Sequence, residues 1–193
     1  MAVSGSHLVD LLLMPKDVDL RPSAWVEGSK QPIDNEMPVS VTTGMSLDEL
    51  GLTMFQTFAR MEYALKAAGY HQGDGDAKPD WDRLGRECDT YLREHVSPDL
   101  RAAIEYILEE PPQKQVIEKG QLEWKQVLAH GQTQGEQLLV YVRRVRNNLF
   151  HGGKFNGHWF TPERSEPLLR HSLAVLCACL EACPVINGAF RQE

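Results

Sequence analysis

Residues 135–153 read GEQLLVYVRRVRNNLFHGG and predict a single helix that ends in a turn. The apolar side chains of this stretch recur at steps of three and four residues, which is the spacing of one helix face. These side chains are Leu138, Val142, Val145 and Leu149. Glycines directly after His151 are a typical sign of a helix end, because glycine adopts a left-handed turn at no steric cost. We expect this helix to bury one face and to present amide, imidazole and guanidinium groups on another.

Helical patterns of this kind recur along most of the chain and predict an all-α bundle of four to five main helices. The first helix has the clearest start, because Ser46 and Glu49 can form a capping box. The helices are expected over about residues 46–69, 80–95, 97–110, 135–151 and 163–183. Residues 113–130 favour a further helix or a broken one, and almost nothing in the sequence reads as a strand.

The length of 193 residues suits one domain with appendages. Four prolines interrupt residues 1–44 and predict an irregular N-terminal extension. The helical domain is expected over residues 45–187, and residues 188–193 are expected to form a short tail.

The longest early apolar run covers residues 11–14 and is far too short to cross a bilayer. No positively charged segment precedes it, so we expect neither a signal peptide nor a membrane anchor. Three of the four cysteines, Cys177, Cys179 and Cys183, lie in one helical pattern without other residues at metal-ligand spacing. We expect them to be buried thiols of a cytoplasmic protein that has no metal site and no cofactor.

The net charge of −7 argues against a broad surface for nucleic acid. The charge is unevenly placed, however, because residues 137–162 contain no Asp or Glu. The cations of this run are Arg143, Arg144, Arg146 and Lys154. A local basic island on an acidic protein indicates one anion site.

Arg146, Asn147 and His151 carry the chemistry of the helix end. A planar guanidinium grips phosphate through two N–H groups, and an imidazole moves a proton near neutral pH. These two groups without a carboxylate suit metal-independent cleavage of RNA, in which a 2′-hydroxyl attacks the neighbouring phosphate. Asn147 lies four residues before His151 and so shares its helix face. Arg146 lies about 140° from His151 around an ideal helix, so both reach one phosphate only through a distorted helix end or a second copy.

On these residues the chain resembles the HEPN superfamily of nucleotide-binding domains. The family motif is an arginine, often followed by a polar residue, with a histidine after four to six intervening residues, and Arg146, Asn147 and His151 match it. The glycine pair, the last apolar helix and the first helix are also similar, so the resemblance covers about residues 46–183. It implies an all-α bundle and a homodimer in which two motifs line one cleft. It further implies RNA cleavage without metal, in toxin–antitoxin or phage-defence systems.

The resemblance implies His151 as general acid or base, Arg146 as phosphate ligand, and Asn147 as the residue that orients the histidine or the substrate. The cations expected to contact RNA are Arg143, Arg144 and Lys154. Several alternatives stay open from the sequence. The alternative to a ribonuclease is a non-catalytic module that binds RNA, a nucleotide or a partner protein such as an antitoxin. Glu62 either orients Arg146 or pairs elsewhere, and Trp159 either stacks on a base or covers the core.

Overall fold

The first helix begins at the capping box that the sequence predicts. In the computed structural model, the Ser46 hydroxyl accepts a hydrogen bond from the amide of Glu49 at 3.3 Å. The Glu49 carboxylate accepts one from the amide of Ser46 at 2.8 Å. Two amides that have no partner inside the helix are thus satisfied, and α1 runs over Leu47–Ala67. Gly69 follows at a φ of +81°, which confirms it as the stop.

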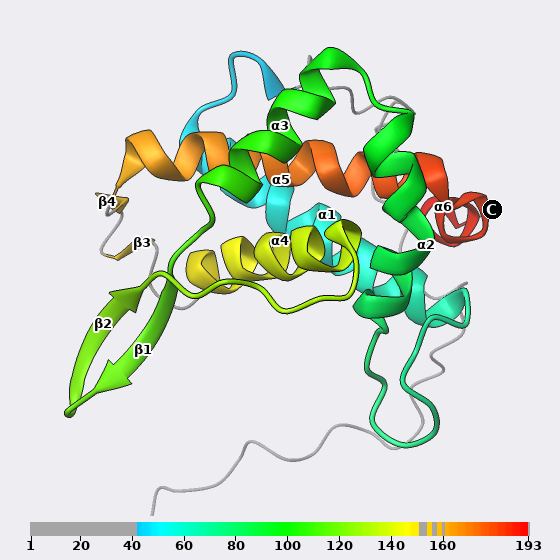
Figure 1. Cartoon of the computed structure of the whole chain (residues 1–193), viewed down its shortest axis with the longest axis horizontal. Coiled ribbons are helices and arrows are strands. Elements are labelled where there is room, and N and C mark those ends of the chain that lie inside the picture. The colour runs from blue at the N-terminus through cyan, green and yellow to red at the C-terminus, as the bar shows by residue number, and fades with distance from the viewer. Residues whose placement is uncertain (1–41, 151–153, 156–157, 160, 193) are drawn as a thin grey trace, which may run out of the picture. The chain divides into compact units, whose positions relative to one another are not determined.

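The structure describes residues 42–150, 154–155, 158–159 and 161–192, which all belong to one compact unit of the chain. Most of them are helical, as predicted (Figure 1). The helices after α1 are α2 (Trp81–Glu94), α3 (Pro98–Glu109), α4 (Gln134–Phe150), α5 (Pro162–Ala182) and α6 (Pro184–Arg191). The expected N-terminal extension lies outside the described residues, apart from residues 42–44.

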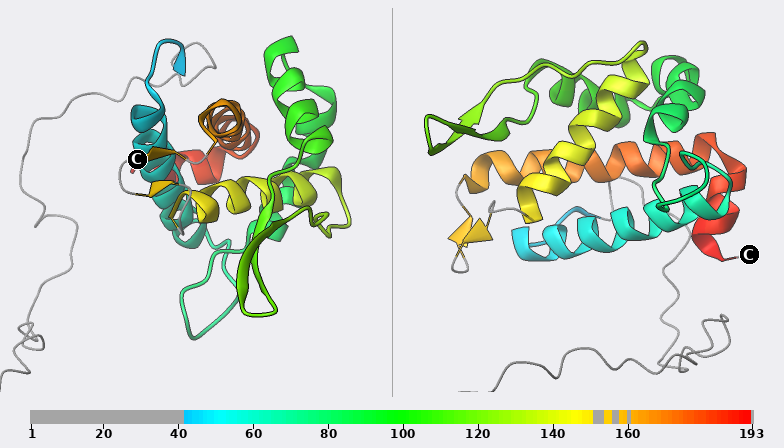
Figure 2. Two further views of the ribbon diagram at one scale, coloured as in Figure 1. Left: turned by 90° about the vertical axis from the view of Figure 1, so that its left-hand side faces the viewer. Right: turned by 90° about the horizontal axis from the view of Figure 1, so that it is seen from below.

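Helix α5 forms the centre of the bundle, and α1, α2, α3 and α4 pack against it. Figure 2 shows α5 end-on between these helices. A helix with apolar residues on all sides is stable only when it is buried all round. The buried apolar side chains of α5 fit this rule, and they include Leu168, Leu169, Leu173, Val175, Leu176 and Leu180.

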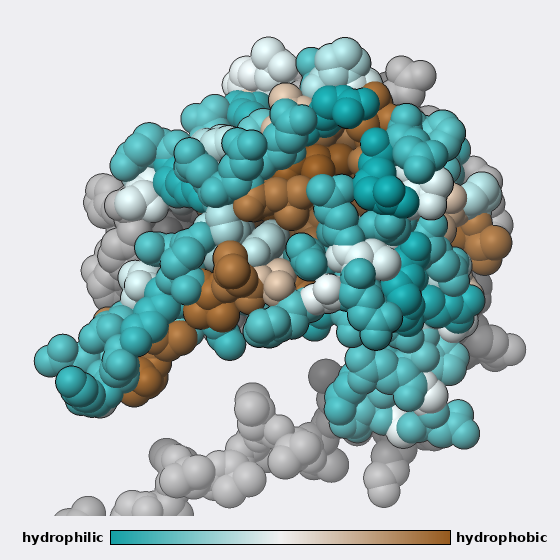
Figure 3. All heavy atoms as spheres, in the orientation of Figure 1, coloured by the Kyte–Doolittle hydropathy of each residue, from teal (hydrophilic) through white to brown (hydrophobic). Residues whose placement is uncertain are grey.

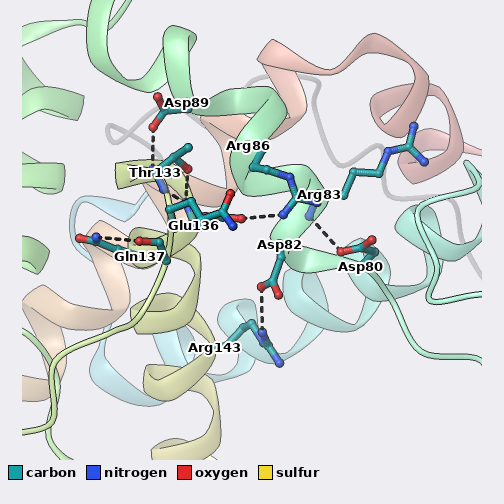
Figure 4. Close-up of polar contacts among 12 residues, drawn as sticks. Asp80, Asp82, Arg83, Arg86, Asp89, Thr133, Glu136, Gln137 and Arg143 are labelled. Carbon is teal, nitrogen blue, oxygen red and sulfur yellow. Dashed lines mark hydrogen bonds and ion pairs between the residues drawn. The ribbon is translucent and has the colours of Figure 1, made fainter.

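Two glycines allow α2 and α4 to cross in close contact. A Cβ atom on Gly135 would lie 2.2 Å from the carbonyl oxygen of Gly85, which no real side chain tolerates. Asp89 of α2 accepts a hydrogen bond from the amide of Gly135 at 2.9 Å. Glu136 accepts one from the amide of Thr133 at 3.0 Å and pairs with Arg86 at 2.6 Å (Figure 4). The start of α4, and so the helix that carries the predicted site, is fixed to α2.

Residues 113–130 are not helical, and the expectation of a helix there is wrong. They form an antiparallel hairpin of β1 (Lys114–Glu118) and β2 (Gln121–Lys125). Lys119 and Gly120 connect the strands with φ angles of +49° and +79°, the combination that a tight two-residue hairpin turn requires. A second, shorter hairpin of β3 (Lys154–Phe155) and β4 (His158–Trp159) follows α4. The fold is therefore mostly helical, with two small hairpins beside the bundle.

The helical part of the chain also extends further than expected. Pro184 ends α5 but occupies the first turn of α6, where its missing amide costs nothing. Arg60 of α1 donates a hydrogen bond to the carbonyl oxygen of Phe190 at 2.7 Å and lies 4.4 Å from the centroid of its ring. Residues 188–191, which the sequence assigned to a tail, therefore belong to a helix that packs on α1.

None of the helices in the described ranges is by itself long and apolar enough to span a membrane. Helices α5 and α6 are long and apolar enough only when counted together, across a bend of 110°.

The cysteines are free thiols, as expected from the sequence. Cys88, Cys179 and Cys183 are buried and Cys177 is half-buried. Burial raises the pKa of the Cys177 thiol to about 12, so it carries little thiolate near neutral pH. Across the part of the chain that the structure describes, no group of three His, Cys, Asp or Glu side chains could hold a metal ion.

Candidate functional site

Helix α4 positions the predicted site by burying its opposite face. Leu138, Val142 and Val145 are buried and Leu149 is half-buried, which confirms the predicted apolar stripe. The helix continues to Phe150, one residue before the predicted histidine. Arg146 and Asn147, near the end of this helix, have different surroundings.

The guanidinium of Arg146 lies between two aromatic rings. It is 5.2 Å from the ring centroid of Phe58 and 4.7 Å from that of Phe150. Arg146 also donates a hydrogen bond to Oδ1 of Asn147 at 3.0 Å. Glu62 forms no ion pair with it within the described residues. Aromatic faces and an amide therefore hold this cation, and no carboxylate of the described ranges neutralises it.

Asn147 and Asn148 differ in role although they are adjacent. Asn148 donates a hydrogen bond to the carbonyl oxygen of Gln113 at 2.8 Å and so fixes the base of the β1–β2 hairpin to α4. Asn147 is exposed and lines a hollow of about 370 Å³. Lys114 and Arg143 line the same hollow. Asn147 therefore contacts Arg146 on one side and lines the hollow with the cations Lys114 and Arg143 on the other.

Arg143 is exposed, as its predicted contact with RNA requires. The closest carboxylate in an ion pair with it is Asp82, at 3.9 Å, and both side chains are solvent-accessible (Figure 4). Exposed pairs of this kind contribute about 0–1 kcal/mol, so a phosphate can compete for the guanidinium. Lys114 adds a second exposed cation. The sequence did not reveal it, because residues 113–130 were expected to be helical.

Arg144 is placed differently from the RNA-contacting residue that the sequence suggested. Its side chain is buried and donates hydrogen bonds to the carbonyl oxygens of Pro112 at 2.9 Å and Val127 at 2.6 Å. Burial lowers the pKa of its guanidinium from the ordinary value. These two carbonyls flank the β1–β2 hairpin on both sides. Arg144 therefore has a structural role, and we do not count it among the candidate RNA ligands.

Two further residues of the predicted site are described only in part or not at all. His151 lies outside the described residues. The backbone of Lys154 starts β3 and pairs with that of Trp159 in β4. The sequence-predicted residues that the structure brings together are therefore Arg146, Asn147 and Arg143.

An exposed aromatic pair that was not predicted from the sequence lies beside Arg146. Phe55 of α1 and Phe150 of α4 have ring centroids 5.2 Å apart, with their planes inclined by 49°. Each residue is 45% exposed. Only a position of Phe55 off the apolar stripe of α1 could have indicated that it faces solvent.

A larger groove lies on the other side of the end of α4. It has a volume of about 680 Å³ and is lined by Trp124 of β2 and by the ends of α3, α4 and α5. Its apolar residues include Val145, Leu149 and Leu168, and Asn148 and Arg164 contribute polar groups. Figure 3 shows apolar side chains between α3 and α4 and along the hairpin, on a surface that is otherwise largely hydrophilic.

The candidate site thus combines an arginine, an amide, two exposed cations and two aromatic rings at one helix end. The arginine and the amide are directly hydrogen-bonded. The chain matches no family model, no curated protein and no solved structure.

Proposed function

We propose that the protein is a metal-independent endoribonuclease of the HEPN type, with a cleft formed by two copies of the chain. The observation that carries the proposal is the hydrogen-bonded pair of Arg146 and Asn147 at the end of α4. Asn147 lies four residues before His151 in the sequence. The guanidinium is half-buried between aromatic rings and has no carboxylate partner among the described residues. A cation in this state is suited to a phosphate.

In the proposed reaction the 2′-hydroxyl of one nucleotide attacks the adjacent phosphorus. A histidine removes the hydroxyl proton or donates a proton to the departing 5′-oxygen, and His151 is assigned this role. Arg146 stabilises the charge that develops on the phosphate oxygens. The products are a 2′,3′-cyclic phosphate and a 5′-hydroxyl, and no metal takes part.

Two copies are proposed because of the geometry of a helix. Arg146 is directed toward Phe58 of α1, whereas Asn147 lines the hollow with Arg143. A residue five positions after Arg146 lies about 140° further around an ideal helix. A homodimer in which the arginine of one copy meets the histidine of the other satisfies this constraint.

Arg143, Lys114 and Lys154 are proposed to contact the RNA backbone. The first two line the hollow beside Asn147, which supports the assignment, and Lys114 takes the place of the buried Arg144. Few clustered cations imply a short contact and a modest salt dependence of binding. The proposed setting is the cytoplasm, in a toxin–antitoxin or phage-defence system.

A second candidate function is a non-catalytic module that binds a partner protein, such as an antitoxin. The observation that favours it is the apolar face of the β1–β2 hairpin. Ile117 and Leu122 face each other across the strands and are 70% and 61% exposed. Exposed apolar patches commonly mark contact surfaces. This function predicts a stable complex without RNA cleavage.

The test is incubation of the purified protein with end-labelled RNA in the presence of EDTA. We expect cleavage by the wild type and a decrease of about 100-fold or more in rate for His151→Ala. His130→Ala is the matched control, because His130 is an exposed histidine in the loop before α4. Cleavage at the wild-type rate by His151→Ala would refute the assignment. Cleavage by a contaminating enzyme would be unaffected by any of these substitutions.

A further inference from the structure

The aromatic pair beside Arg146 stands out among the exposed apolar residues of the described chain. Phe55 and Phe150 come from different helices and meet at the surface with ring centroids 5.2 Å apart. Each of the two side chains is 45% exposed to water, which is unfavourable for apolar surface. A ligand with a flat apolar face would remove this surface from water.

The pair is continuous with the proposed phosphate-binding residue. The Arg146 guanidinium lies 4.7 Å from the Phe150 centroid, and on its inner side it lies 5.2 Å from that of Phe58. Phe58 in turn stacks on Trp81, with centroids 4.8 Å apart, and both are buried. The inner rings thus anchor the arginine, and the outer rings remain available beside it. The positive charge of Arg146 therefore lies directly beside the exposed surface of Phe150.

We propose that Phe55 and Phe150 form a stacking subsite for an unpaired nucleobase of the RNA whose phosphate Arg146 binds. This inference rests on the proposed function and names the form of its substrate. A base in a duplex is stacked on both faces and cannot reach the rings, so the subsite selects single-stranded RNA. Every base has a π face, so the contact discriminates little among the four bases.

Charge favours RNA over an apolar segment of another protein as the occupant. Among the described residues 137–150 there is no carboxylate, and Arg143 and Arg146 both lie in this run. The half-buried Arg146 guanidinium, which has no carboxylate partner among the described residues, would be costly to bury further against an apolar partner surface. It is complementary to the phosphate that accompanies every base.

The test uses fluorescence anisotropy with short, unstructured 2′-O-methyl oligonucleotides, which cannot be cleaved because the methyl group blocks the attacking hydroxyl. Phe150→Leu and Phe55→Leu keep the apolar volume but remove the flat ring. We expect each to weaken binding by about 5- to 100-fold. Tyr63→Leu is the matched control, since Tyr63 is an exposed aromatic residue of α1 that has no ring contact in the described structure. It should bind like the wild type.

The same measurement with a fully abasic oligonucleotide separates stacking from general weakening. Without bases the wild type should bind weakly, and Phe55→Leu should cause no further loss, since the Arg146 guanidinium stacks on Phe150 and Phe58 and not on Phe55 in the described structure. Tight RNA binding that neither phenylalanine affects would overturn the subsite and leave the ribonuclease assignment intact. Failure of the wild type to bind RNA would overturn both. Light scattering of each variant adds one more outcome, because a change from dimer to monomer would make the rings a contact between copies and overturn the subsite.

Discussion

Arg146 of α4 lies 5.2 Å from the ring centroid of Phe58 of α1, a residue that is 3% exposed. Arg146, the residue proposed to bind phosphate, therefore packs against the hydrophobic core. Such a contact contributes about 0.5–1 kcal/mol, and it requires a planar cation for the best stacking.

Arg146→Lys should for this reason lose activity although it keeps the charge. The ammonium cannot stack on Phe58 and Phe150 and cannot contact phosphate through a planar fork. We expect a decrease of about 100-fold in kcat/KM for RNA cleavage. The urea midpoint of unfolding should change little, since the loss of one cation–π contact is small. The contrary result is a lysine variant as active as the wild type, which would mean that only the charge matters.

Arg144→Ala should act on stability, in contrast to its neighbour. The substitution leaves the buried carbonyl group of Pro112 and the half-buried carbonyl group of Val127 without their donor. Each buried unsatisfied group costs about 1–3 kcal/mol, so the free energy of unfolding should fall by at least that amount. Arg143→Ala is the matched control and should remain within about 0.5 kcal/mol of the wild type, because Arg143 is exposed. Equal unfolding midpoints for the two variants would show that Arg144 does not fasten the hairpin.

Gly135→Ala should destabilise the crossing of α2 and α4. The added methyl group would lie 2.2 Å from the carbonyl oxygen of Gly85, and the helices must move apart to admit it. We expect a cost of about 1–3 kcal/mol in urea unfolding. Gly188→Ala in α6 is the control, because its Cβ would meet no atom within 4 Å in the described chain. Alanine there should be neutral or stabilising, as expected for a helical position.

Glu136 should make the stability of the fold sensitive to acid. Burial raises the pKa of its carboxyl group, but hydrogen bonds from Arg86 and from the amides of Gln132 and Thr133 outweigh burial and hold the pKa below 4.5. A pKa that is lower in the folded state stabilises the fold above the unfolded value, and this stabilisation is lost as the pH falls through the folded value. Glu136→Gln should therefore unfold at lower urea concentration at pH 7 and depend less on pH below 4.5. Glu94→Gln, at an exposed position of α2, should retain the wild-type pH profile.

The elements that the sequence predicted correctly are those with local signals. The capping box at Ser46 fixed the start of α1, and the apolar spacing from Leu138 to Leu149 fixed the buried face of α4. These signals depend on neighbours three or four residues away, which the sequence itself supplies.

The β1–β2 hairpin was missed because its turn has an uncommon residue. Lys119 takes a positive φ, where asparagine, aspartate or glycine is usual. The apolar residues Ile117 and Leu122 are exposed, so they show no pattern of a half-buried strand. The adjacent β-branched residues Val116 and Ile117, and the alternation of Leu122 and Trp124 with polar residues, were the signals available in the sequence.

The site could be predicted only where its residues are contiguous. Arg146 and Asn147 follow from the motif, but Arg143 and Arg144 look equivalent in the sequence. Their different surroundings come from the segments that flank the hairpin, whose carbonyl oxygens at Pro112 and Val127 accept hydrogen bonds from Arg144, whereas Arg143 is exposed. Lys114 and Phe55 reach the end of α4 from distant parts of the chain. No local pattern shows such contacts.

The most direct test is the rate of RNA cleavage in EDTA by Arg146→Ala, by His151→Ala and by their equimolar mixture after subunit exchange. In a site shared by two copies, a mixed dimer has one intact combination of arginine and histidine. The mixture should then recover about a quarter of the wild-type rate, while each variant alone stays at least about 100-fold below it. A wild type that cleaves no RNA, or variants as active as the wild type, would contradict the ribonuclease assignment. A mixture that stays inactive beside an active wild type would contradict the two-copy site.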